Sequence, residues 1–330
     1  MASACRLIWT VPALVALALP FARAQAETIT VTHFGAQFYA APYVVAREKG
    51  FFKEAGVDIT GFLTSPGGGT SVRNTLASDL PYGEVALAAA IEAIRAGQPL
   101  KIVNGGVESI GDSVWITQPT APLGGIKDLI GKRVGFTSPG SVSNMLLLLS
   151  LKKAGIDISK VQMVPAGGIG ANLSAVLSGA LDSAFIGEPV WTQEQGKVKA
   201  VFRPKDLLGP DMTQTVGVVT EDFIKSHPDT IRAIIAGRAK GVTYLYAHPE
   251  EAADMTAKVY NMDPQLVRGV FLHLKELQWW GHGDLHYAAM DRMAEGLQIV
   301  GKRFDDLGVL QASAAFEAIQ PWANKRPVLA

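Results

Sequence analysis

The chain has 330 residues, enough for one large or two medium-sized α/β domains. Its 30 Lys and Arg residues balance its 30 Asp and Glu residues, and aromatic residues are not interleaved with basic clusters. This composition argues against binding to nucleic acid or to an anionic membrane surface.

Residues 1–26 have the pattern of a secretory signal peptide. Arg6 supplies the positive region, an apolar run follows, and small residues allow cleavage after Ala24 or Ala26, of which we favour Ala26. Cys5, the only cysteine, would leave with the signal peptide, which excludes disulfides and cysteine chemistry from the mature chain. An uncleaved anchor is the alternative, but the apolar run is short for a membrane span. The expected location is the periplasm.

The first part of the mature chain alternates between strands and helices. Residues 28–33 predict a strand, residues 40–55 a helix and residues 57–62 a second strand. The loop 34–39 is rich in aromatic and amide side chains, and the turn 65–70 carries three glycines. Such a turn tolerates an anion at its backbone, although it is neither a Walker loop nor a dinucleotide fingerprint. A flexible connector is the alternative for this turn.

Short strands are predicted next at residues 85–90 and 100–104, joined by a helix near 91–96. Residues 113–117 are expected to be extended. Prolines and glycines near 118–124 then interrupt the pattern. We expect the chain to cross into a second lobe there.

The stretch 132–151 predicts a buried strand, a tight turn and a leucine-rich helix apolar enough to be largely buried. Either Ser138 or Ser141 could cap this helix, and Gly140 would let another group approach the backbone closely. Free N–H groups at the helix start would lie at the carboxyl edge of a sheet, where α/β folds bind small polar ligands. An ordinary helix start is the alternative.

Residues 161–165 and 182–186 predict further strands, with a glycine-rich turn and a helix over 171–178 between them. Residues 215–220 form the last predicted strand, and the chain after it is helical. The pattern indicates an α/β fold with mostly parallel sheets and helices on both faces.

Two crossings divide the expected fold into two lobes. A discontinuous first lobe would comprise residues 27–116 and 217–330, and an inserted second lobe residues 117–216. Two linking strands would form a hinge, with a ligand in the cleft between the lobes.

Several stretches resemble the periplasmic solute-binding proteins of ABC importers, in the nitrate/sulfonate/taurine and thiamine-precursor (pyrimidine) binding group. These stretches are 41–52, 128–135, 139–141, 178–184 and 227–228. The resemblance implies a type II periplasmic-binding-protein fold that closes on one small organic molecule without transforming it. The implied partners are that ligand and the permease and ATPase subunits in the inner membrane. The protein is expected to be a monomer.

In the family, the cleft is lined by the loop after the first strand, the turn after the second strand and the start of the second-lobe helix. The turn after residues 182–186 also reaches the cleft edge. Carried over to this sequence, the expected ligand-binding residues are Phe34, Gln37, Phe38, Tyr39, Gly68, Gly69, Thr70, Ser138, Gly140, Ser141, Glu188 and Trp191.

Some of these expected ligand-binding residues could have a purely structural role instead. The aromatic side chains could serve packing alone, and Glu188 could form a salt bridge or sit in the first turn of a helix. None of the three loops carries Lys or Arg, and Glu188 argues against a strongly anionic pocket. Trp279 and Trp280 are expected in the core or on the surface of a lobe.

We expect no catalytic residue, cofactor or metal site, since the six histidines show no metal-ligand spacing. An enzyme of thiamine or menaquinone precursor synthesis with the same fold is one alternative, and a periplasmic sensing subunit is another. Candidate ligands are sulfonates, taurine-like zwitterions, aromatic carboxylates and pyrimidines. Nitrate suits an aromatic-edged pocket least.

Overall fold

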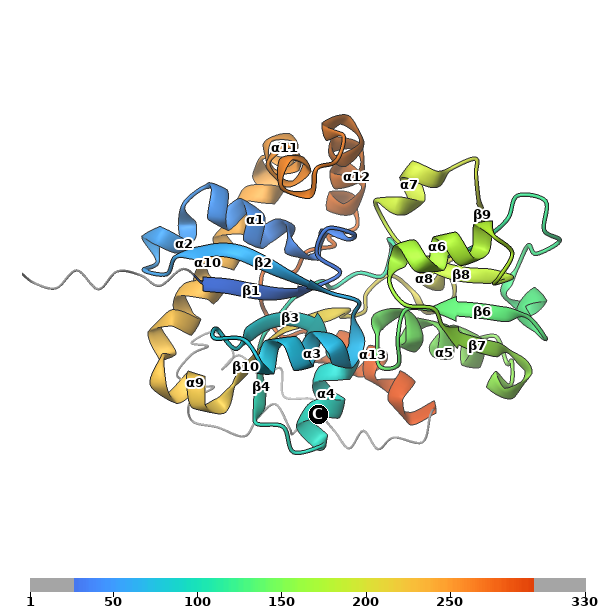
Figure 1. Ribbon diagram of the computed structural model, residues 1–330, viewed down its shortest axis with the longest axis horizontal. Helices are drawn as coiled ribbons and strands as arrows, with labels where there is room; N and C mark the ends of the chain where they lie inside the picture. The colour runs from blue at the N-terminus through green and yellow to red at the C-terminus, as the bar shows by residue number, and fades with distance from the viewer. Residues whose placement is uncertain (1–26, 300–330) are drawn as a thin grey trace, which may run out of the picture.

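The computed structural model describes residues 27–299, so the expected signal peptide lies outside the described residues. Two lobes lie side by side, each built on a five-stranded sheet with helices packed against it (Figure 1). Within residues 27–299, no helix is both long and apolar enough to span a bilayer.

The strands alternate with helices along most of the chain. The strands are β1 (Glu27–Thr32), β2 (Ile59–Ser65), β3 (Tyr82–Ala86), β4 (Leu100–Gly105), β5 (Val114–Thr117), β6 (Arg133–Phe136), β7 (Gln162–Pro165), β8 (Ser183–Ile186), β9 (Lys199–Phe202) and β10 (Thr215–Thr220). The helices are η1 (Phe38–Ala40), α1 (Ala41–Glu48), α2 (Phe51–Glu54), α3 (Gly68–Leu76), α4 (Leu87–Arg95), η2 (Ile126–Leu129), α5 (Val142–Lys153), η3 (Ile158–Lys160), α6 (Ile169–Leu177), α7 (Val190–Glu194), α8 (Pro204–Leu208), α9 (Glu221–Ser226), α10 (Pro228–Ala247), α11 (Pro249–Tyr260), α12 (Pro264–Glu276) and α13 (Tyr287–Ile299).

Each sheet is mixed in the same way. The strand order is β2-β1-β3-β10-β4 in the first lobe and β7-β6-β8-β5-β9 in the second. In the first sheet only β10 runs against its neighbours, and in the second sheet only β5 does. Each reversed strand is the first one after the chain crosses between lobes. The predicted α/β fold with mostly parallel sheets is therefore confirmed, with one reversed strand in each sheet.

The crossings lie at different residues from those we expected. β5 pairs with β8 and β9, so residues 114–116 belong to the second sheet and the proline-rich stretch 118–124 lies inside the second lobe. Thr215 and Val216 pair with β3, so they belong to the first sheet. The sequence pattern predicted these strands but contained no signal for the sheet that each would join.

The two crossing segments form a short antiparallel ladder between the lobes. The amide of Ile110 donates to the carbonyl of Pro210 at 2.8 Å, Met212 donates to Glu108 at 3.1 Å, and Gln214 donates to Val107 at 2.7 Å. Ser109 and Asp211 form a bridge at its centre. This ladder is the two-strand hinge of the fold.

Local boundaries differ where glycine or helix propensity overrides the apolar pattern. The helix expected over 40–55 is split into α1 and α2 by Gly50, which adopts the left-handed conformation at φ +77°. The strand expected over 85–90 ends at Ala86, and the alanine-rich residues after it start α4. β9 was not predicted from the sequence.

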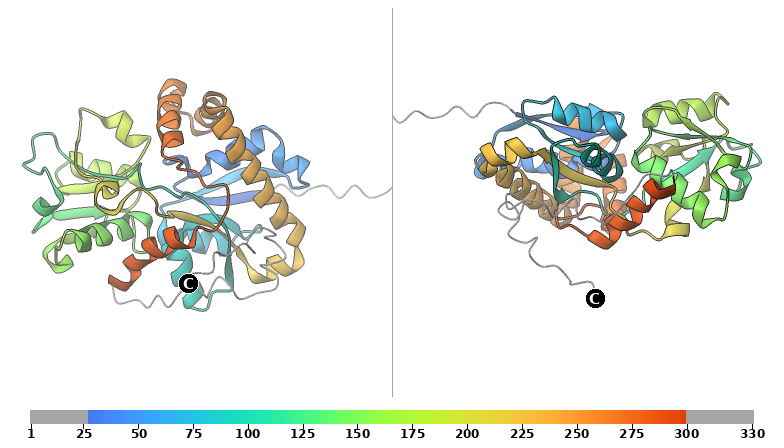
Figure 2. Two further views of the ribbon diagram at one scale, coloured as in Figure 1. Left: turned by 180° about the vertical axis from the view of Figure 1, so that it is seen from behind. Right: turned by 90° about the horizontal axis from the view of Figure 1, so that it is seen from below.

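Successive residues of the central strands point to opposite faces of the first sheet, which buries both faces. Val218 packs with α3 and α4, whereas Val219 packs with α1, α10 and the helices that follow. α5 is buried over residues 142–151, as predicted from its leucine run. α13 packs against both α5 and α4 and so lies across the two lobes (Figure 2).

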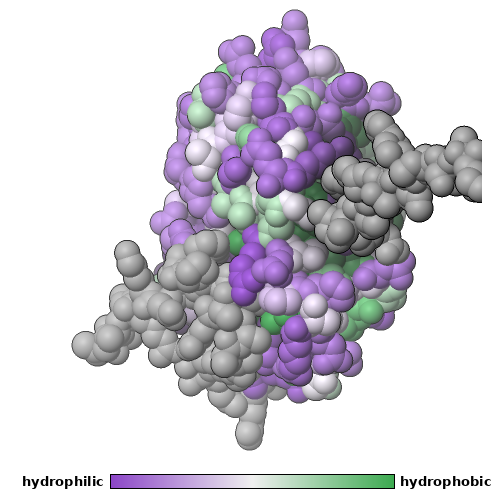
Figure 3. Space-filling view, turned by 90° about the vertical axis from the view of Figure 1, so that its left-hand side faces the viewer, coloured by the Kyte–Doolittle hydropathy of each residue, from purple (hydrophilic) through white to green (hydrophobic). Residues whose placement is uncertain are grey.

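The surface at the end of the first lobe is mainly hydrophilic, with smaller hydrophobic areas between the polar side chains (Figure 3). The large exposed hydrophobic side chains of the described residues lie on different elements: Leu63, Ile130, Leu177 and Leu272. Such scattered exposure is normal for a folded domain.

Candidate functional site

The turns that follow strands of the two sheets meet where the lobes face each other. A Cβ built on Gly68 would lie 2.6 Å from the carbonyl oxygen of Pro139 and 2.6 Å from Oγ of Ser138. A Cβ on Gly187 would overlap Nε2 of Gln37 in the first lobe. Only a residue without a side chain permits these approaches. We call this contact zone, formed by Gln37, Gly68, Asp112, 138–141 and 187–188, the interlobe seam.

The turn before α5 uses most of its own hydrogen-bonding groups. Ser141 is the N-cap, and its side chain accepts a hydrogen bond from the amide of Asn144 at 3.2 Å. The amide of Gly140 donates to Oδ1 of Asn144 at 3.1 Å. These two amides are therefore not free for a ligand, unlike the helix start we expected. Oγ of Ser138 is buried and has no hydrogen-bond partner among the described residues.

Replacing Ser141 with alanine should lower the free energy of unfolding by ~1 kcal/mol, because α5 loses its side-chain cap. Ser138→Ala is the matched control, since its hydroxyl makes no hydrogen bond in the structure. Urea unfolding followed by tryptophan fluorescence measures both. Equal losses in the two variants would show that Ser141 is not the cap.

Two of the predicted aromatic site residues lie in the first-lobe core. Phe38 is fully buried against Tyr260 and Phe271. Phe34 is half-buried, with its ring centre 5.4 Å from that of Phe62 and 5.1 Å from that of Tyr260. These contacts favour the packing interpretation for both.

Tyr39 belongs instead to a buried polar network at the hinge. Its ring stacks on Trp279 at 5.2 Å, and its hydroxyl donates to Oε1 of Gln214 at 2.7 Å. Gln214 and Trp279 each donate to Oδ1 of Asp112 at 2.8 Å. Trp279 is buried, as expected, but it also positions a carboxylate. Neither Asp112 nor Gln214 was among the residues expected from the sequence.

The network leaves three buried polar atoms without a partner among the described residues. They are Oδ2 of Asp112 and both Nε2 and Oε1 of Gln37. A Cβ on Gly187 would lie 3.0 Å from Oδ2 of Asp112, so these atoms converge on the same glycine of the second lobe. Buried polar groups are normally paired, so these unpartnered atoms make this part of the seam the candidate place for a bound molecule.

The carboxyl groups at the seam have raised pKa values. Burial raises the pKa of Asp112 to about 6, and the neighbouring charge of Glu188 adds to the effect. Burial also raises the pKa of Glu188, although its side chain accepts a hydrogen bond from the amide of Thr192 at 3.2 Å. Glu188 therefore lies two residues before α7, not in its first turn as one alternative expected, and accepts from an amide of that helix.

Two arginines reach predicted site residues from outside the loops. The guanidinium of Arg73, on α3, donates to Oγ1 of Thr70 at 2.8 Å. The guanidinium of Arg203 lies 4.8 Å from the centre of the half-buried Trp191 ring. Neither arginine was predicted as a site residue, because each one lies outside the loop that it contacts. Gly69, between Gly68 and Thr70, faces Arg73 without close contact to the second lobe.

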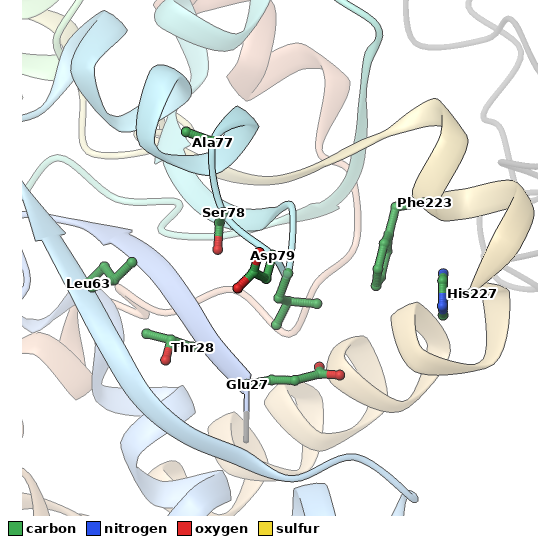
Figure 4. A pocket seen from close by; sticks show the side chains of 9 residues that line it. Glu27, Thr28, Leu63, Ala77, Ser78, Asp79, Phe223 and His227 are labelled. Carbon is green, nitrogen blue, oxygen red and sulfur yellow. The ribbon is translucent and has the colours of Figure 1, made fainter. Parts of the chain in front are cut away.

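A separate pocket of about 430 Å³ lies at the amino edge of the first sheet (Figure 4). It is lined by Glu27, Thr28, Leu63, Ala77, Ser78, Asp79, Leu80, Phe223 and His227. None of the predicted site residues lines it. The seam lies at the carboxyl edge instead, where α/β sheets bind ligands, and we take the seam as the candidate site.

In residues 27–299, no cluster of three or more His, Cys, Asp and Glu side chains is arranged to hold a metal ion.

Comparison with known proteins agrees with the fold. The model of the NMT1/THI5-like family matches residues 37–252. A candidate aliphatic sulfonates-binding protein of Bacillus subtilis (strain 168) is 23% identical over 253 residues, which cover 74% of each chain.

Solved structures with this fold include both a binding protein and an enzyme. The periplasmic aliphatic sulphonate binding protein SsuA from Escherichia coli superposes with a TM-score of 0.64 and 18% identity, over 84% of this chain and 86% of SsuA. The desulfurization enzyme DszB gives a TM-score of 0.60 at 15% identity, over 89% of this chain and 99% of DszB.

Proposed function

The chain belongs to the NMT1/THI5-like family, and from this we propose that it is the extracytoplasmic solute-binding component of an ABC importer. It captures a small organic molecule in the interlobe seam and delivers it to a permease and its ATPase. Two relatives reported above, from Bacillus subtilis and Escherichia coli, are named as binding proteins for aliphatic sulfonates, which supports the role.

The observation that carries the proposal is the convergence of unpartnered, buried polar atoms at the seam. Gln37, from the first lobe, and Asp112, from the hinge, both face Gly187 of the second lobe. A small molecule bound there would contact both lobes and the hinge together. Binding would then favour the arrangement in which the lobes are in contact.

The hinge allows such a change while each sheet stays intact, although α13 must shift against α4 or α5 when the lobes move. Only two segments connect the sheets, and their ladder can bend while each sheet stays intact. Export to the periplasm by cleavage of the signal peptide after Ala26 or Ala24, and action as a monomer, complete the proposal.

A ligand screen tests this function. We expect one compound among alkyl- and arylsulfonates, taurine, aromatic carboxylates and pyrimidines to raise the melting temperature. At 100 times the dissociation constant, a ligand adds ~2.7 kcal/mol to the free energy of unfolding. Nitrate is the member expected to have the least effect. No stabilisation by any of these compounds would contradict the proposal.

The DszB match keeps the enzymatic alternative testable. If the protein only binds, each ligand should be recovered unchanged after incubation, which mass spectrometry of the mixture measures. Conversion of the ligand would replace the transport role by a catalytic one.

A further inference from the structure

The polar network at the hinge also indicates which kind of ligand fits the seam, provided that the proposed function holds. We infer that the ligand presents a positively charged amine or a similar N–H-bearing nitrogen, which binds the free carboxylate oxygen Oδ2 of Asp112 beside the side-chain amide of Gln37.

The two oxygens of the Asp112 carboxylate have different surroundings. Oδ1 accepts hydrogen bonds from Trp279 and Gln214, both at 2.8 Å, which fixes the orientation of the group. Oδ2 is buried and unpartnered among the described residues, and so is the side-chain amide of Gln37. A carboxylate oxygen can only accept hydrogen bonds, so the missing partner of Oδ2 is a donor.

The charge around Asp112 selects the same kind of donor. The groups that face its carboxyl are the acidic Glu188 and the neutral Tyr39, Trp279 and Gln214. The basic side chains His273 and Arg203 act on Glu188.

An anionic ligand group placed at Oδ2 would add repulsion, and a group without N–H or O–H would leave the buried oxygen unsatisfied. A protonated nitrogen would satisfy the oxygen and offset its charge in a site of low dielectric. Burial raises the pKa of Asp112 to about 6, so the carboxylate is ionised at pH 8, and a cation bound beside it would lower that pKa again.

The variant Asp112→Asn isolates this oxygen. It keeps an acceptor for Trp279 and Gln214 and replaces Oδ2 with an N–H donor. The matched control is Asp206→Asn, which removes one negative charge from an exposed position on α8. Urea unfolding of both variants shows whether either one is merely less stable.

Matched probe pairs supply the readout by isothermal titration at pH 8. Taurine is compared with ethanesulfonate, and benzylamine with benzyl alcohol. In at least one pair, the nitrogen-bearing member should bind the wild type more tightly by about tenfold or more, as expected for a charge-assisted hydrogen bond. Asp112→Asn should abolish this preference, and Asp206→Asn should retain it.

The preference should also depend on pH. As the pH falls through about 6, Asp112 becomes protonated and loses its charge, so the affinity for the amine should fall. The nitrogen-free partner should show no such fall.

Equal binding within both pairs, survival of the preference in Asp112→Asn, or failure of both nitrogen-bearing probes to bind would overturn the inference. In each case the proposed function would stand if the broader screen found another ligand. If neither the pairs nor the screen gave any binding, the proposed function would fail and the inference with it.

Discussion

Arg238→Met should lower the free energy of unfolding by about 3–5 kcal/mol, because it leaves the buried carboxylate of Glu84 without its cation. The side chains of Arg238, on α10, and Glu84, on β3, are 1% and 0% exposed, and Nε lies 3.1 Å from Oε2. Glu84 also accepts from Thr215 at 2.7 Å, and Arg238 donates to the carbonyl of Gly281 at 2.8 Å. The pair therefore joins α10, β3, β10 and the loop before α13 inside the first lobe.

Guanidinium unfolding followed by tryptophan fluorescence measures the loss. Arg268→Met is the matched control, because its pair with Asp254 is 44% and 41% exposed and should contribute less than about 1 kcal/mol. The double variant Arg238→Met/Glu84→Gln removes both charges and should recover part of the loss. An equal cost for Arg238→Met and Arg268→Met would contradict the interpretation.

The parts of the fold that were predictable are those encoded by local pattern. The leucine run after Ser141 predicted a buried helix, and α5 is buried along that run. The choice of cap between Ser138 and Ser141 was not predictable, because it depends on the position of the Asn144 amide. Strand β5 was also visible in the sequence, but its membership of the second sheet depends on pairing with distant strands.

The candidate site was only partly predictable for the same reason. Gln37 and Ser138 lie in turns after strands, and Gly68 starts the helix after β2; topology places such positions at the carboxyl edge. Asp112, however, is linked to Gln214 across 102 positions and to Trp279 across 167 positions. No local motif marks residues that are brought together in this way. Phe38 shows the converse difficulty, since the sequence alone does not distinguish an aromatic ligand contact from core packing, and Phe38 is fully buried.

Replacing Gly68 with valine should weaken ligand binding by about 100-fold or more, which corresponds to ~2.7 kcal/mol. Gly68 has a φ of +55°, a conformation that β-branched residues rarely adopt. Its Cβ would also lie 2.6 Å from the backbone oxygen of Pro139, which cannot move aside as a flexible side chain could. The variant should therefore hold the lobes apart at this point of the seam, and the ligand would lose its contacts with one lobe.

The separation of the lobes can be measured by small-angle X-ray scattering, and the affinity by titration with the best ligand of the screen. Gly155→Val is the matched control, because Gly155 has a similar φ of +71° but a Cβ there would have no other atom within 4 Å. It should bind nearly as the wild type does. The backbone strain at position 68 should lower the free energy of unfolding of Gly68→Val by about 1–2 kcal/mol. Urea unfolding measures this loss separately from the effect on binding. If Gly68→Val keeps the wild-type affinity and radius of gyration, the contact between Gly68 and Pro139 does not form on closure, and the lobes must close on the ligand elsewhere.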